Sequence, residues 1–187
     1  MNMEQNVIQK NMWNAAGQTG FVLGLYTTVF LMISVMLQDS QMNAVLSSVV
    51  SMALWALKFA GCIWIMLFFM KKFASDNEGV DNSQTFRFGI LTALLSALVY
   101  AAACFANVAF ISPEFYAEQM QMTMEQLGPV MDSNTAASME KFLDILPQVT
   151  FFSNLIYCFV YGMVLSFILS RNIPSKDPFA DYKPEEK

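Results

Sequence analysis

One stretch of this sequence, from Phe88 to Ile111, contains no charged side chain, and that stretch restricts where the chain can fold. An α-helix rises about 1.5 Å per residue, so about 20 apolar residues cross the ~30 Å hydrocarbon core of a bilayer. Arg87 precedes the stretch, and Pro113 follows it as a helix stop. The stretch therefore predicts a helix that spans a membrane.

The composition extends this prediction to the rest of the chain. Hydrophobic residues make up 56% and charged residues only 13% of the sequence, whereas soluble domains carry about 25% charged residues. The charges are grouped in short segments between long apolar runs, as in polytopic membrane proteins. We expect an all-α fold, a four-transmembrane-helix bundle, with spans at about 17–37, 45–70, 88–111 and 149–169.

The segments outside these spans differ in character. Residues 1–16 form a polar lead-in to the membrane domain of residues 17–171, and the proline-containing tail 172–187 is expected to be disordered. The loop 112–147, between the third and fourth spans, predicts one or two short amphipathic helices on the outer side. The first begins at Pro113 and the second covers about 134–146, with Pro147 opening the fourth span.

The distribution of positive charge predicts the orientation. Lys141 is the only lysine or arginine in the predicted outer loops, and Lys58 lies inside a span. The remaining eight of ten lie on the opposite side: Lys10, Lys71, Lys72, Arg87, Arg171, Lys176, Lys183 and Lys187. Because positive charge is retained on the cytoplasmic side, we expect both termini to be cytoplasmic and the outer face to be acidic.

Small side chains recur at helical spacing in two of the spans. Gly20 and Gly24 form a GxxxG pair in the first span. In the third span a small residue appears every four positions: Gly89, Ala93, Ala97 and Ala101. Such residues let membrane helices approach each other closely, either within one chain or against a partner protein.

Several short motifs resemble the small four-span membrane proteins of domain-of-unknown-function (DUF) family 4199. They are Gln84-Thr85-Phe86-Arg87-Phe88-Gly89, Ser112-Pro113-Glu114 followed by a Gln/Met/Glu-rich helix, and Asp177-Pro178-Phe179. The resemblance covers about residues 13–179 and implies a bacterial inner-membrane protein. It brings no catalytic residues, because the family has no assigned activity. The methionine-rich loop helix departs from the more acidic, leucine-rich loops of the family.

Lys58 is the only charged residue predicted to lie within a span. It is 13 residues from Lys71, which places it about 20 Å into the membrane at 1.5 Å per residue. Tyr100 and Tyr157 fall at a matching depth, so the three could form a polar site for an anion or a lipid headgroup. Alternatively, Lys58 extends outward and pairs with an acid, namely Asp39, Glu140 or Asp144.

The sequence offers little for catalysis or metal binding. It contains no histidine, which removes the commonest general base and metal ligand. Cys62, Cys104 and Cys158 lie in separate apolar segments, where a packing role is expected. Met120, Met122 and Met124 are soft ligands suited to Cu(I), but on a helix Met122 points away from the other two. We expect no cofactor, no metal and no nucleic-acid partner.

Two functions remain open at this stage. The small residues and the absence of a catalytic constellation favour a non-enzymatic subunit or scaffold of a membrane complex. The alternative is a small carrier or a lipid- or anion-binding protein that acts through Lys58. Four spans are few for a carrier, so that alternative would require a parallel homo-oligomer.

Overall fold

The structure is a computed structural model that describes residues 3–38, 43–77, 80–127 and 133–173. Within these ranges the chain is entirely helical, as the sequence predicts. Its elements are α1 (Met3–Gln38), α2 (Ala44–Asp76), α3 (Asn82–Ala106), the π-helical turn η1 (Asn107–Ile111), α4 (Pro113–Leu127) and α5 (Ser133–Arg171).

Four segments are long and apolar enough to cross a membrane, which confirms the four-span architecture. They are Lys10–Leu37, Val45–Asp76, Asn82–Ile111 and Lys141–Arg171. Large apolar side chains are widely exposed on them, because these faces are suited to contact with lipid rather than water. The predicted tail beyond residue 173 lies outside the described residues.

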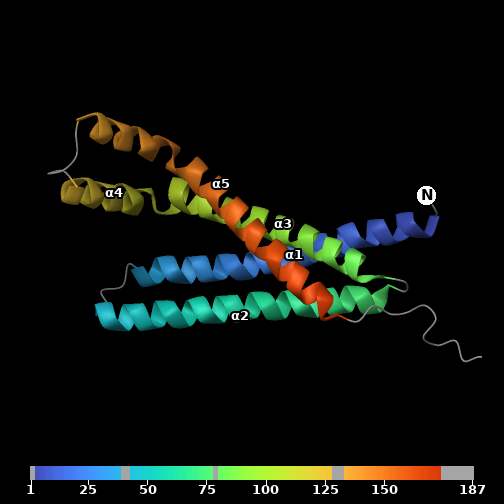
Figure 1. Ribbon diagram of the computed structural model, residues 1–187. Coiled ribbons are helices and arrows are strands. Elements are labelled where there is room, and N and C mark those ends of the chain that lie inside the picture. Colours follow the sequence, from blue (N-terminus) through green and yellow to red (C-terminus); the bar gives the residue numbers. More distant parts are fainter. Residues whose placement is uncertain (1–2, 39–42, 78–79, 128–132, 174–187) are drawn as a thin grey trace, which may run out of the picture.

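The helices are arranged around α3 (Figure 1). This helix packs against α1 and crosses α5, whereas α2 lies antiparallel beside α1 and has fewer contacts with α3 and α5. The buried apolar core gathers where α1 begins and α2 ends, around Met66, Met70, Phe73 and Phe88. The membrane domain therefore consists of a closely packed α1–α3–α5 unit with α2 attached to it.

Small residues make the close contacts of that unit. A Cβ atom at Gly24 would lie 2.6 Å from the Cβ of Val99 on α3, and one at Gly20 would lie 2.7 Å from the Cβ of Leu95. A Cβ at Gly89 would lie 2.7 Å from Ser166 Oγ on α5. The following alanines of the same series, Ala93, Ala97 and Ala101, are at most 3% exposed. Both small-residue motifs therefore pack within the chain itself.

The segment between the third and fourth spans differs in one respect from the expected pair of short helices. Only α4 is a separate helix, because the segment expected at about 134–146 is the first part of α5, which continues through Pro147. Proline lacks an N–H to bond the carbonyl of Leu143 and its ring clashes with that carbonyl, so it bends a helix without always ending it. Figure 1 shows α5 changing direction along its length.

A buried amide joins α3 to α4. The side chain of Asn107 is 1% exposed, and its Nδ2 donates to the Tyr116 hydroxyl at 2.9 Å. Ser112 Oγ lies 3.5 Å from Asn107 Oδ1, and the backbone N–H of Ser112 donates to the Asn107 carbonyl at 2.8 Å. Burial raises the pKa of Tyr116, while the hydrogen bond from Asn107 acts in the opposite direction. The π-helical turn thus fixes the start of α4.

Candidate ligand-binding cavity around Lys58

Two of the three residues predicted at one membrane depth meet in the structure. Lys58 on α2 donates from Nζ to the hydroxyl of Tyr100 on α3, at 3.2 Å. The same Nζ lies 4.4 Å from the centroid of the Tyr100 ring, within the range of a cation–π interaction. The ammonium is therefore held by one phenol from a neighbouring helix.

This ammonium has no acidic partner among the described residues. Asp144, one of the three acids considered for it, forms no ion pair with Lys58. Asp39 and the side chain of Glu140 lie outside the described part of the chain. A lysine in an apolar setting normally pairs with an acid or reaches water. Because Lys58 has no such acid among the described residues, its positive charge is available to a bound anion.

Lys58 and Tyr100 line a cavity of about 170 Å³ that is bounded by all four spans. Its wall is mostly apolar, with a few polar groups and one charged group, Lys58. The lining residues are Leu23, Thr27, Trp55, Lys58, Phe59, Cys62, Met66, Ala93, Ser96, Tyr100, Asn154, Tyr157, Cys158, Tyr161, Gly162 and Leu165. Apolar walls with a few polar groups are typical of small-molecule sites.

The third predicted residue, Tyr157, also lines this cavity, but its side chain is 71% exposed. Tyr161 lies one turn later on the same helix and is half-buried. Its hydroxyl is buried and has no hydrogen-bond partner in the described structure. An unpaired buried hydroxyl is costly, so Tyr161 offers a hydrogen bond to a ligand. The sequence analysis missed Tyr161, although its i+4 spacing from Tyr157 could have identified it.

The comparison with protein families bears directly on this architecture. The model of a family described as "Protein of unknown function (DUF4199)" matches residues 18–171, which include all of the cavity residues. The chain belongs to the DUF4199 family. No curated protein and no solved structure matches it.

The match confirms the resemblance drawn from the entry and exit motifs of the third span. It also covers the four apolar helices that define this DUF4199 protein as a membrane protein. The family description carries no activity, so the chemistry of the site is argued from its residues alone.

The cysteines of this DUF4199 protein gather near Lys58 from three helices. Cys62 of α2 and Cys158 of α5 line the cavity, and Cys104 is buried one turn after Tyr100 on α3. All three are free thiols. In the described residues no three acidic, cysteine or histidine side chains are placed to share a metal ion. The thiols add apolar, polarizable surface to the site.

Other residues considered for a role lie elsewhere. Met120, Met122 and Met124 are on the helix α4, and Met122 is 40% exposed. Asn154 reaches the cavity, but its amide donates to the Thr150 carbonyl of its own helix at 2.8 Å. The arrangement at Lys58 can thus bind a negatively charged group beside an apolar chain.

Proposed function

We propose that this protein binds an amphipathic anion, such as a carboxylate or a phosphate on a hydrocarbon chain, inside the membrane. The observation that carries the proposal is the Lys58 ammonium, which lines an apolar cavity and has no acidic partner among the described residues. The binding role is non-enzymatic, because the cavity offers a charge and hydrogen-bond donors but no general base.

Three hydrogen-bond donors line the cavity, namely Lys58, Tyr100 and Tyr161. Tyr100 accepts a hydrogen bond from Lys58, which leaves the proton of its own hydroxyl available to a ligand oxygen. Tyr161 contributes a second hydroxyl that has no partner in the described structure. In a medium of low dielectric constant, an anion held by a cation and two hydroxyls is strongly stabilised.

The main argument for the scaffold function was that the small residues could pack against a partner protein. Gly20, Gly24 and Gly89 pack against other helices of the same chain, so they give no evidence of an external partner. We therefore place the anion-binding function first. If binding leads to transport, the small size of a four-span unit favours a parallel homo-oligomer as the working form.

We further propose the bacterial inner membrane as the location, with both termini in the cytoplasm. The support is the concentration of basic residues at the ends of the spans where α1 begins and α2 and α5 end. A single cysteine at position 120, in a variant that lacks the native cysteines, tests the orientation. It should react with an impermeant maleimide added outside intact spheroplasts, and reaction only after lysis would overturn the topology.

Ligand binding can be tested through the native thiols. Dodecyl phosphate should protect Cys62 and Cys158 from N-ethylmaleimide, whereas dodecanol, which has the same chain without the charge, should protect them much less. Cys104 is the internal reference, because it is buried and does not line the cavity. Labelling of each cysteine is measured by mass spectrometry of the purified protein.

The substitution Lys58→Met should weaken protection by dodecyl phosphate. Hydrogen bonds to charged groups contribute about 1.5–3 kcal/mol, which corresponds to a roughly 10- to 150-fold loss of affinity. Lys71→Met is the matched control, since Lys71 is exposed and lies outside the cavity. Equal affinity in the two variants would refute a role for Lys58.

A further inference from the structure

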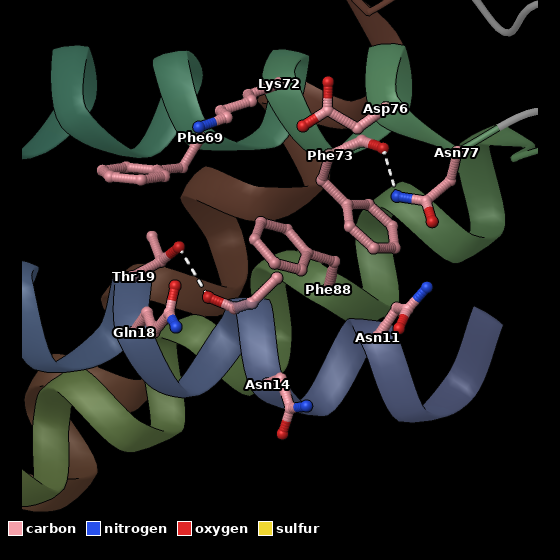
Figure 2. Close-up of a pocket in the computed structure, with 11 residues that line it drawn as sticks. Asn11, Asn14, Gln18, Thr19, Phe69, Lys72, Phe73, Asp76, Asn77 and Phe88 are labelled. Carbon is pink, nitrogen blue, oxygen red and sulfur yellow. Dashed lines mark hydrogen bonds between the residues drawn. The ribbon is translucent and has the colours of Figure 1, made fainter. Parts of the chain in front are cut away.

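A second, larger cavity lies at the end of the bundle where α1 begins and α2 ends. It has a volume of about 390 Å³ and is formed by residues of α1, α2 and α3 (Figure 2). Its polar wall contains three amides of α1, namely Asn11, Asn14 and Gln18, and two charged residues of α2, Lys72 and Asp76. This wall differs from the Lys58 cavity, where a cation is the only charged group.

The two charged residues carry opposite charges one turn apart on the same helix. At this spacing Lys72 and Asp76 could form an ion pair, yet neither forms one with any residue in the described ranges. The side-chain amides of Asn11, Asn14 and Gln18 likewise have no hydrogen-bond partner there. The wall therefore offers a cation, an anion and amides, all on exposed side chains, to a ligand at the surface.

Aromatic side chains separate this cavity from the bundle interior. Phe73 and Phe88 are 4% and 1% exposed, and their rings stack with centroids 4.4 Å apart and an interplanar angle of 3°. Figure 2 shows both rings between α1 and α2. They belong to the same buried core as Met66 and Met70. Access is thus from the membrane surface and not from the Lys58 cavity.

The cavity lies at the level where the spans end. The first span begins at Lys10 and the second ends at Asp76, so Asn11 and Asp76 mark the boundary of the apolar region. Trp13, between two of the cavity amides, is 51% exposed, as expected for a tryptophan at a membrane–water interface. At this level lipid headgroups are the most abundant charged molecules.

We propose that this cavity binds a zwitterion that combines a phosphate with a primary ammonium, as in the headgroup of phosphatidylethanolamine. Lys72 pairs with the phosphate, Asp76 pairs with the ammonium, and the α1 amides donate to the remaining oxygens. Both charges of the ligand are then matched, which a phosphatidylglycerol headgroup, with a phosphate but no ammonium, cannot achieve.

The test uses the full-length protein in mild detergent and native mass spectrometry with added phosphatidylethanolamine or phosphatidylglycerol. The wild type should retain phosphatidylethanolamine preferentially. Asp76→Asn should abolish the preference, because it removes only the partner of the ammonium. Lys72→Met should weaken binding of both lipids by about tenfold, equivalent to about 1.4 kcal/mol.

Matched controls keep this result separate from folding and from the first cavity. Lys71→Met changes the adjacent exposed lysine, which does not line the cavity, and should leave lipid retention unchanged. Lys58→Met should also leave it unchanged, so the two sites can fail independently. Unfolding temperatures of the variants confirm that the fold is retained.

Free phosphoethanolamine distinguishes the source of the zwitterion. If it displaces phosphatidylethanolamine at a concentration similar to that of the lipid, the cavity recognises a soluble zwitterion. If displacement requires a large excess, the acyl chains contribute and the ligand is the lipid. Equal retention of both lipids by the wild type, unaffected by Asp76→Asn and Lys72→Met, would overturn the proposal.

Discussion

The α1–α3–α5 unit and the helix α2 differ in how closely they pack against the rest of the chain. Of the apolar part of each span, 44% is buried within the chain in the third span, 28% in the first, 17% in the fourth and 11% in the second. Glycine and alanine bring α1 and α5 close to α3. In contrast, α2 is joined to the others through long side chains, and Trp64 and Phe68 remain exposed.

The contacts of α2 surround the Lys58 cavity. Tyr26 Oη of α1 donates to the Leu57 carbonyl at 3.0 Å, Lys58 donates to Tyr100, and the Phe59 ring lies 5.4 Å from that of Tyr161. Long side chains hold helices apart, so space remains among them. The cavity therefore forms on the side of α3 where α2 attaches, whereas the glycine and alanine contacts of α1 and α5 with α3 leave little space.

The largest effect on stability is expected from a substitution in the closely packed α1–α3–α5 unit. Gly24→Ala places a Cβ 2.6 Å from the Val99 Cβ, which cannot move without its helix. We expect a loss of about 1–3 kcal/mol of stability, the usual cost of overpacking, measured by reversible unfolding in mixed micelles. Gly17→Ala is the control, because nothing lies within 4 Å of its added Cβ. Equal stability of the two variants would mean that α1 and α3 are not closely packed.

The next largest loss of stability is expected when a buried amide is removed. Asn107→Ala removes the hydrogen bond to Tyr116 and leaves that hydroxyl without its donor. The expected loss is about 1 kcal/mol or slightly more. Asn154→Ala, by comparison, removes only a bond within its own helix and should change the unfolding free energy much less. The reverse order would show that the cavity side carries the stability.

Lys58→Met should change the stability in the opposite direction. A charge within the hydrocarbon region costs free energy, and its bond to Tyr100 offsets this only in part, so removal should leave the stability unchanged or raise it by up to about 1 kcal/mol. Unfolding is measured without added anion. A loss as large as that of Gly24→Ala would mean that Lys58 is a structural residue of the bundle.

The smallest effect is expected at Gly61→Ala, on α2. The added Cβ would meet the hydroxyl of Tyr26, which is the end of a side chain. Movement of this hydroxyl breaks its hydrogen bond, which costs about 0.5–1.5 kcal/mol. Replacing glycine by alanine stabilises the helix by about 0.5–1 kcal/mol. The unfolding midpoint should therefore barely change. A loss of stability equal to that of Gly24→Ala would mean that α2 is packed as closely as the α1–α3–α5 unit.

Several features of the fold could be predicted because they depend on local composition. Hydrocarbon cannot hydrogen-bond a backbone, so a long uncharged stretch must become a helix there. The start of α4 at Pro113 and the small residues of α3 follow from equally local signals. Pro147 was less informative, because a proline can begin a helix or bend one, and only the surrounding contacts decide.

The sequence by itself determined four apolar helices that are long enough to cross a membrane, and their order, since length along the helix axis follows from a constant rise per residue. Tertiary structure decided how each helix is rotated about that axis. That rotation brings Tyr100 to Lys58, buries the hydroxyl of Tyr161 while exposing Tyr157, and directs Gly20 and Gly24 toward α3. Rotation is set by contacts between helices distant in the sequence, which a single span does not record.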